Sequence, residues 1–484
     1  MFAWVSLLGL QAASVNEALP PPILLRGVSV VPCTGEDPRV LTNQAVLLHE
    51  GRIAGLGAVG DVDVPPGVRI LDARGLFLMP GLWDMHVHPD DPEIWERNPG
   101  EDERAAFLDL FVLHGVTGVR DMGGDLARVK GWRDAIERGE RLGPRILFGG
   151  PLVDGPEPMW PGSIACATAE DGRAAVRRLK AEGVDFVKVY SLLPREAYFA
   201  IAEECRAQGM RFAGHVPDRV TNREAVDAGQ ASLEHLLRLH REFGDLDGAR
   251  AAAGNLPPET STAERSEAMV TAMLAKVDWE GARSLFRHAA ARGVAVTPTL
   301  LVWERNAFYD PAAPEMAARL PFMPPTFRAW WSPEQNVHLR DRAEAEVRMR
   351  RALLEFYFDC VRELRDAGVT LMTGSDCGGN PLCFPGWGVH DELALLVRAG
   401  LTPHEALLAA TRNPARFLGL GDRLGTVEGG KFADLVLLEA DPLADVANVR
   451  KIRAVIVRGR MLERAELDAR LTALRERFTA PAAR

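Results

Sequence analysis

Two histidines one residue apart, His86 and His88, stand in the segment GLWDMHVHP (81–89), directly after the apolar run GLFLMP (75–80). In a β-strand, residues i and i+2 point to the same face, so the two imidazoles would lie side by side. Such a pair is either a hydrogen-bonded structural feature or the first half of a metal site. The rest of the chain decides between these interpretations.

Further potential ligands lie within or at the ends of other short apolar runs. They are Lys188 in DFVKVYS (185–191), His215 in GHVP (214–217), His235 in EHL (234–236) and Asp376 in TGSD (373–376). If these runs are strands of one barrel, all six groups converge at one mouth, where enzymes of that architecture place their active sites. Imidazole nitrogens and a carboxylate suit zinc or a similar divalent ion.

Lys188 lies within an apolar run, where a buried ammonium is costly unless its charge is removed or paired. A lysine amine pushed towards neutrality can add carbon dioxide and become a carbamate, an anionic ligand whose two oxygens can bridge two cations. Without that reaction, the ammonium would be repelled by adjacent metal ions. The alternative is a structural lysine whose side chain extends out of the barrel to water.

Eight short apolar runs, each ending in polar or glycine residues, alternate with amphipathic helical stretches in the middle of the chain. The expected strands are 78–88, 116–122, 145–150, 185–191, 211–216, 231–236, 294–301 and 369–376. This eightfold alternation predicts an α/β fold with a (β/α)8 TIM barrel. A doubly wound open sheet would show the same alternation, but no GxGxxG motif follows the first strand.

The two ends of the chain are β-rich and broken by turn residues. We expect residues 23–78 and 425–465 to pair into a small β-sandwich domain, with 79–424 as the (β/α)8 metal-dependent hydrolase domain and 466–484 as a C-terminal helical tail. Two connections, 241–277 and 303–351, are oversized, and such loops usually have a function or lack order. The aromatic content of the second favours an insertion that covers the substrate. Helix packing or a homo-oligomer contact is the alternative.

The net charge of −10 argues against nucleic acid or an anionic membrane as the main partner, so we expect a small-molecule substrate. The six cysteines form no CxxC motif and predict free thiols. Residues 1–22 contain an apolar run too short for a membrane span, which takes about 20 residues. They predict a signal peptide and a periplasmic or secreted protein, although no basic residue precedes Arg26. A disordered or packed N-terminus of a cytoplasmic protein is the alternative.

Together these motifs resemble those of the amidohydrolase superfamily, in the branch of imidazolonepropionase-like proteins and prolidase-type, Xaa-Pro dipeptidase-like enzymes. The resemblance covers residues 23–465 and includes PGLWDMHVH (80–88), VTGVRDMGG (116–124) and the four motifs quoted above. It is most specific in the block 390–443. There, Thr402, Pro403 and Glu405 also predict a helix start with a capping box.

The resemblance implies a binuclear centre of two divalent metal ions, with zinc the first expectation. Its ligands would be His86, His88 and Asp376 for the first ion, His215 and His235 for the second, and a carboxylated Lys188 with a hydroxide as the bridge. Asp376 would be the catalytic residue that takes a proton from the attacking hydroxide and passes it to the leaving group. Imidazolonepropionase itself uses one metal and no carbamate, so Lys188 favours a peptidase-like hydrolase.

Three further residues are candidates for substrate binding. Tyr190, two residues after Lys188, and Arg120, at the end of the second expected strand, could meet a substrate carboxylate; packing or a loop network is the alternative for both. His390 follows the eighth expected strand and either lines the pocket or starts a helix. Prolidase-type relatives often place a tyrosine after the histidine of strand five, whereas this chain has HVPD (215–218), which puts the carboxylate binder in doubt.

These features predict a hydrolase that cleaves a C–N amide bond, in a dipeptide or an N-acyl amino acid, with a metal-bridging hydroxide. A lactonase or an organophosphate ester hydrolase is the alternative, because the same centre attacks C–O and P–O bonds. A catalytically silent metal- or ligand-binding barrel is a third hypothesis, against which the intact Asp376 argues.

Overall fold

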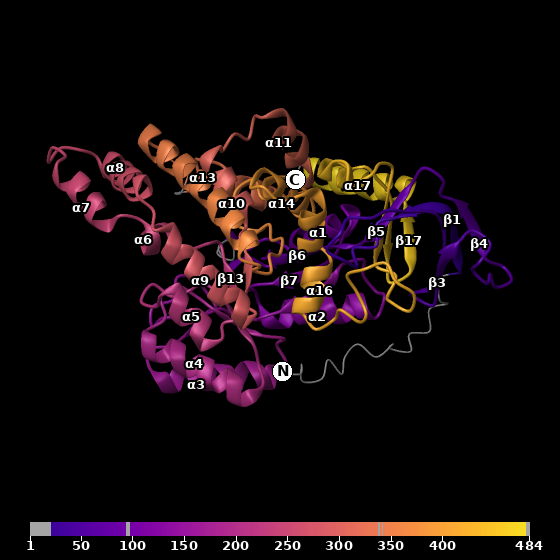
Figure 1. Ribbon diagram of the computed structural model, residues 1–484, viewed down its shortest axis with the longest axis horizontal. Coiled ribbons are helices and arrows are strands. Elements are labelled where there is room, and N and C mark those ends of the chain that lie inside the picture. The colour runs from indigo at the N-terminus through magenta and orange to yellow at the C-terminus, as the bar shows by residue number, and fades with distance from the viewer. Residues whose placement is uncertain (1–20, 93–96, 337–338, 341, 481–484) are drawn as a thin grey trace.

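The computed structural model describes residues 21–92, 97–336, 339–340 and 342–480, in which strands and helices alternate (Figure 1). Apart from residues 21 and 22, the segment expected to be a signal peptide lies outside these ranges. Within them, no helix combines the length and the apolar character that a membrane span needs.

Both ends of the chain contribute to one mixed sheet of eight strands, in the order β17-β16-β15-β5-β1-β2-β3 with β4 paired to β1. The strands are β1 (Ile23–Val30), β2 (Leu41–His49), β3 (Arg52–Ala58), β4 (Arg69–Asp72), β5 (Phe77–Pro80), β15 (Leu435–Leu438), β16 (Ile452–Val457) and β17 (Arg460–Glu463). The antiparallel pairing of β5 with β15 places Met79 opposite Val436 and joins the two terminal segments. Because all eight strands are hydrogen-bonded into one sheet, the two facing sheets of the expected sandwich are not shown.

The strands between these ends form two parallel sheets. One has three strands, β6 (Leu82–Val87), β7 (Val116–Asp121) and β8 (Arg145–Phe148). The other has the order β10-β9-β11-β12-β13-β14, with β9 (Val153–Asp154), β10 (Ile164–Ala165), β11 (Val187–Val189), β12 (Phe212–Gly214), β13 (Ser232–Glu234) and β14 (Ala295–Thr297). Seven of the eight predicted runs contain a strand of these sheets, whereas β9 and β10 lie outside every predicted run.

The run predicted as the eighth strand makes two isolated parallel bridges instead of a continuous ladder. Leu371 bridges to Val296 of β14, and Cys377 bridges to Val87 of β6. Residues 371–377 therefore stand between the edge of the six-stranded sheet and the edge of the three-stranded sheet.

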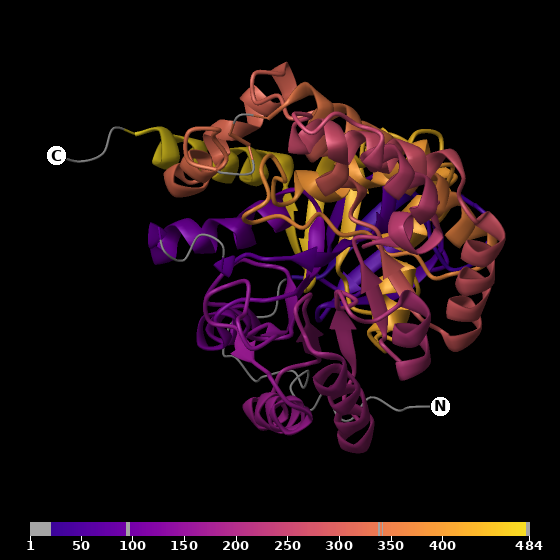
Figure 2. The ribbon, with the colours of Figure 1, turned by 90° about the vertical axis from the view of Figure 1, so that its left-hand side faces the viewer.

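Helices follow the parallel strands and surround them (Figure 2). They include α1 (Glu101–Leu113), α2 (Leu126–Glu137), α3 (Ala169–Glu182), α4 (Arg195–Gln208), α5 (Asn222–Ala228), α9 (Trp279–Arg292), α13 (Glu344–Asp366), α14 (Trp387–Arg398), α15 (Pro403–Ala409) and α16 (Arg412–Phe417). The capping box predicted at Thr402 and Glu405 is present at the start of α15.

The two oversized connections contain helices of their own. The first holds α6 (Leu239–Phe243), α7 (Leu246–Gly254) and α8 (Thr262–Ala275), and the last two project from one end of the molecule in Figure 1. The second, residues 303–351, begins within α10 (Leu300–Ala307) and holds α11 (Pro314–Arg319) and α12 (Pro325–Trp330). Beyond β17, α17 (Arg464–Thr479) occupies the region where a helical tail is expected.

Candidate metal centre

Three of the predicted ligands form a compact group. His86 lies on β6 and His88 just after it, and Nε2 of each lies 3.5 Å from Oδ1 of Asp376. One ligand atom from each residue lies within 4.8 Å of the other two. His86 is fully buried, and the side chain of His88 is 12% exposed. Two imidazoles and a carboxylate at this separation are a donor set that fits a divalent ion.

The other two histidines adjoin this group. The ring centroids of His235 and His86 are 4.3 Å apart, and those of His235 and His215 are 4.9 Å apart. Two hydroxyls fix the rings: Oγ1 of Thr299 lies 2.7 Å from Nδ1 of His235, and Oγ of Ser191 lies 2.8 Å from Nδ1 of His215. The structure thus brings all four predicted histidines together.

Lys188 lies on β11 with its side chain fully buried, and its Nζ is 3.5 Å from Nε2 of His86. A glycine on β12 makes room for it. At Gly214, where φ is +130°, a Cβ would lie 2.2 Å from O of Val189 and 2.8 Å from Cδ of Lys188. Only glycine tolerates both this conformation and this close approach, which explains why the GHVP motif begins with glycine.

The backbone at the end of the predicted eighth strand is strained. Asp376 has a φ of +51°, and its N–H donates to O of His86 at 2.8 Å. Two residues later, a Cβ at Gly378 would lie 2.5 Å from O of His88. A left-handed conformation costs a non-glycine residue about 1–2 kcal/mol, and such strain concentrates at functional sites.

Burial lowers the pKa of all four imidazoles. The pKa of His86, His215 and His235 lies well below its usual value, because burial penalises the charged ring and the nearby Lys188 ammonium adds to the effect. Burial likewise lowers the pKa of His88 to about 3. All four rings are therefore neutral at pH 7, which is the form that binds a metal ion.

The two remaining ligand candidates have pKa values near neutrality. Burial lowers the pKa of Lys188 to about 8, although the carboxylates of Glu234 and Asp376 oppose this change. Burial raises the pKa of Asp376 to about 7, although Lys188 opposes this change. Values moved this far from the ordinary range are typical of functional groups.

A cavity of about 210 Å³ opens beside these groups, and His88, His215, His235 and Asp376 all line it. The second oversized connection contributes to its wall, because Trp303 and Asn306 are among the lining residues. The Nε1–H of Trp303 donates to O of His235 at 3.0 Å. Residues at the start of this connection therefore lie next to the candidate ligands.

Tyr190 is the one candidate substrate binder that lines this cavity. Its ring stacks on His215, with centroids 4.1 Å apart and an angle of 26° between the planes. Its hydroxyl accepts a hydrogen bond from Nε1 of Trp160 at 2.8 Å. The Trp160–Tyr190 pair thus forms a fixed aromatic wall beside a predicted ligand.

Arg120 does not reach the cavity, contrary to its proposed contact with a substrate carboxylate. Its guanidinium is buried and donates to O of Met85 at 2.6 Å, to Oγ of Ser232 at 2.9 Å and to Oε1 of Glu234 at 2.9 Å. The physical reason is that successive side chains of β7 point to opposite faces, and the side chain of Arg120 points into the interior between the strands and not into the cavity.

His390 also lies away from the cavity. It is buried on α14, where its Nε2 lies 2.8 Å from O of His114 and its ring packs against that of His114. Neither His390 nor His114 lines the cavity. The structure therefore favours the alternative interpretation, in which His390 belongs to the start of a helix.

Glu234 is a candidate functional residue that the motifs did not single out. It precedes His235 on β13, and its Oε2 lies 2.9 Å from Nδ1 of His86. In the sequence it is only the first letter of EHL. The signal that could have found it is a charged residue inside a short apolar run, which needs a buried partner.

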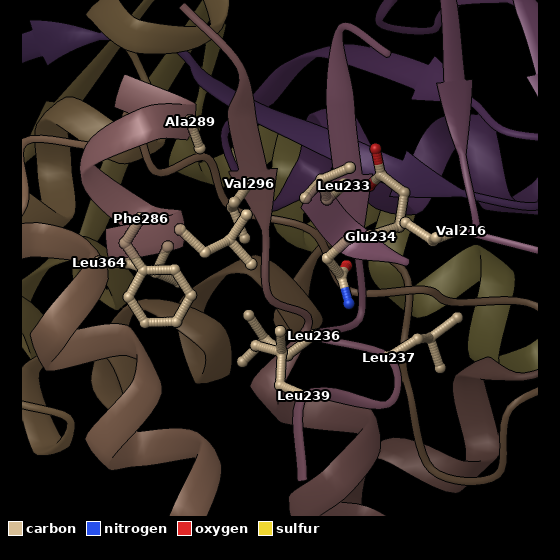
Figure 3. A pocket seen from close by; sticks show the side chains of 12 residues that line it. Val216, Leu233, Glu234, Leu236, Leu237, Leu239, Phe286, Ala289, Val296 and Leu364 are labelled. Atoms are coloured by element: carbon tan, nitrogen blue, oxygen red, sulfur yellow. The ribbon is translucent and has the colours of Figure 1, made fainter. Parts of the chain in front are cut away.

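A second, smaller cavity lies behind β13 and is apolar (Figure 3). Leu233 and Val296 from the strands face Phe286 and Ala289 of α9 across it. Its volume of about 20 Å³ is little more than the space for one water molecule, so it is a gap in the packing.

Comparison with known proteins places this geometry in a family. Residues 77–462 match the model of the Amidohydrolase family. A dihydroorotase of Pelotomaculum thermopropionicum is 25% identical over 471 residues, which cover 91% of this chain and 95% of that protein. An imidazolonepropionase of Ralstonia nicotianae is 27% identical over 429 residues, which cover 83% of this chain and 88% of that protein.

Solved structures share the fold over nearly the whole chain. Bottromycin amidohydrolase superposes with a TM-score of 0.70 at 24% identity, covering 94% of this chain and 91% of its own. An Xaa-Pro dipeptidase with bound methionine in the active site superposes with a TM-score of 0.65 at 18% identity, covering 91% of this chain and 100% of its own. Because the family match spans most of the chain and includes every predicted ligand, this protein is a hydrolase that belongs to the amidohydrolase family.

Proposed function

We propose that this protein is a metal-dependent amidohydrolase that cleaves a C–N amide bond in a dipeptide or an N-acyl amino acid, with two divalent ions at the mouth of a barrel. The observation that supports this most strongly is the burial of Lys188, whose Nζ lies 3.5 Å from Nε2 of His86. An ammonium there would repel a metal ion, whereas a carbamate at the same position would attract two.

We infer that the two parallel sheets are parts of one closed (β/α)8 barrel. Only residues 149–152 separate β8 from β9, and we take these two strands as parts of one third barrel strand that links the two sheets. The bridges from Leu371 to Val296 and from Cys377 to Val87 supply the eighth strand and the closure. In such a barrel, all the predicted ligands sit at the C-terminal ends of strands.

The donor set divides in two around Lys188. His86, His88 and Asp376 would hold the first ion, His215 and His235 would hold the second, and carboxylated Lys188 would bridge them. When bound, two divalent ions acidify the water between them and polarise a carbonyl oxygen. Zinc is the ion that we expect, because it accepts both nitrogen and oxygen donors.

The carbamate would form on the neutral amine of Lys188. The amine nitrogen attacks the carbon of CO2, and an N–C bond forms as one C=O π pair moves onto oxygen. The nitrogen then loses one proton to water, which leaves a singly charged carbamate. Burial favours this step because a pKa of about 8 leaves a larger share of the amine unprotonated than in an exposed lysine.

Asp376 would carry the proton during hydrolysis. Its carboxylate lines the cavity close to His86 and His88, where it can accept a proton and return it. It would take a proton from the attacking water and give it to the departing amine nitrogen. The strained turn at Asp376 fixes the carboxylate near His86 and His88.

The cavity supports an amide substrate with an apolar group. Beside the ligands, polar residues such as Asp91, Asn306 and Asn380 line part of it, and the rest of the wall is aromatic or aliphatic, namely Leu152, Trp160, Tyr190, Leu237, Val302 and Trp303. The resemblance in fold to an Xaa-Pro dipeptidase agrees with such a substrate.

The test is metal analysis together with a substrate panel. Protein loaded with Zn²⁺ in the presence of bicarbonate is assayed on dipeptides, N-acyl amino acids, lactones and organophosphate esters. We expect two ions per chain and turnover of dipeptides or N-acyl amino acids. One ion per chain, or turnover confined to lactones or phosphate esters, would contradict the proposal.

A further inference from the structure

We propose that Glu234 is a positioning residue for the metal centre, which fixes and strengthens His86 as a ligand and is itself held by Arg120. This inference rests on the proposed function, because it concerns how the chain prepares one of the ligands. It assigns a role in metal affinity to Glu234 and Arg120. Both residues are buried, and neither lines the cavity beside the predicted ligands.

The first step is the contact between Glu234 and His86. Oε2 of Glu234 lies 2.9 Å from Nδ1 of His86, and both side chains are buried. A carboxylate can only accept here, so Nδ1–H of His86 donates to it and Nε2 keeps its lone pair. That Nε2 faces the centre, 3.5 Å from Nζ of Lys188 and 3.5 Å from Oδ1 of Asp376.

The second step is the contact between Glu234 and Arg120. Nη2 of Arg120 lies 2.9 Å from Oε1 of Glu234, the oxygen that does not contact His86. Ser232, two residues earlier on the same face of β13, donates its hydroxyl to the same Oε1. A buried carboxyl group needs hydrogen-bond partners, and here Arg120 and Ser232 both donate to Oε1, which leaves Oε2 for His86.

The guanidinium of Arg120 is held in place by further hydrogen bonds. Its Nε–H donates to O of Met85 and its Nη1–H to Oγ of Ser232, and Oγ1 of Thr297 lies 3.3 Å from Nη2. These partners come from three other strands of the parallel sheets. These hydrogen bonds fix the position of the guanidinium, and the guanidinium in turn fixes the position of the Glu234 carboxylate.

The four histidines differ in this respect. The Nδ1 of His88 lies 2.9 Å from the carbonyl O of Gly123, and the other two rings contact the hydroxyls of Thr299 and Ser191. Each of these hydrogen-bond partners is neutral, whereas Glu234 gives His86 a charged one. A carboxylate partner makes an imidazole a more basic ligand, and removing it typically lowers metal affinity about 10- to 100-fold.

The test uses Glu234→Gln, which keeps the shape of the side chain and removes its charge. Glu392→Gln is the control for the same isosteric change at another fully buried carboxyl group: Glu392 accepts from the backbone N–H groups of Leu300 and Leu301 and contacts no predicted ligand. Metal-free proteins are incubated with bicarbonate and titrated with Zn²⁺ in chelator buffers. Thermal unfolding of each metal-free protein is measured in parallel.

We expect Glu234→Gln to weaken one of the two Zn²⁺ binding steps by roughly 10- to 100-fold and to change the other by less than about threefold. Glu392→Gln should lower the unfolding temperature but leave both steps within about threefold of the wild type. Unchanged Zn²⁺ affinity in Glu234→Gln, or equal losses in both variants, would overturn the inference.

If Glu234→Gln does not fold, Ser232→Ala replaces it, and we expect a smaller weakening of the same step; no weakening would overturn the inference. If the wild-type protein binds no Zn²⁺, the proposed function and this inference fail together. Normal binding by the wild type with an unaffected variant would overturn the inference alone.

Discussion

The Nζ atom of Lys188 lies 3.5 Å from the Nε2 atom of His86, and both side chains are buried. This contact joins a strand in the three-stranded sheet to a strand in the six-stranded sheet. It also places an amine among four neutral imidazoles, where a permanent positive charge would be poorly solvated. The carbamate that we propose removes this charge and turns the lysine into a ligand.

Replacing Lys188 by alanine should abolish metal binding and activity, because the bridging anion is lost. Short-chain carboxylic acids should restore part of both by occupying the space of the carbamate. Metal content and rate are measured with and without added acetate or propionate. Lys180→Ala is the control, since Lys180 is an exposed residue that donates to Gln208. Full metal content in Lys188→Ala would refute the bridging role.

Asp376→Asn should lower kcat by roughly 10²- to 10⁴-fold, because an amide cannot accept and return the proton. The affinity for a non-hydrolysed substrate analogue should change far less, since the size of the side chain is kept. Steady-state rates and analogue binding separate the two effects. A protein that only binds its ligand would show no rate in either form.

Gly214→Ala should destabilise the fold and disturb the centre. The added Cβ would meet O of Val189 at 2.2 Å and Lys188 at 2.8 Å, at a φ of +130°. We expect a loss of about 2–5 kcal/mol in the free energy of unfolding from strain and overpacking. Gly229→Ala is the control, because Gly229 has a φ of +88° but open space around it, and it should cost only about 1–2 kcal/mol. Urea unfolding measures both, and equal losses would contradict the role of the close approach.

Tyr190→Phe should lower kcat/KM about fivefold, which corresponds to the loss of one hydrogen bond of about 1 kcal/mol. Trp160→Phe removes the donor to the same hydroxyl and should have a similar effect. The double variant should lose less than the product of the two, because each single change already breaks the pair. Independent effects would show that the pair does not act as a unit on the substrate.

Much of the centre could be predicted because its signals are local. A polar residue that ends an apolar run, as at His215 and His235, reports a strand end directly. The structure gathers six such residues around one cavity or directly beneath it. The capping box at Thr402 and Glu405 was also predictable, because a box of this kind depends on residues three apart.

Other features depend on contacts between distant segments, which the sequence pattern does not contain. Glu234 approaches His86 across the interior, and Arg120 points towards Glu234 rather than the cavity. The terminal strands are a second example. Their sequence pattern predicts that they pair, but whether they form one sheet or two depends on the pairing of both β4 and β5 with β1. The role of residues 1–22 as a signal peptide stays a prediction.

The most direct measurement is a crystal structure of protein loaded with Zn²⁺ and bicarbonate, with diffraction collected at the zinc absorption edge. We expect two anomalous peaks per chain, with extra density on Nζ of Lys188 that reaches both. A single peak beside an unmodified Lys188 amine would contradict the bridged centre.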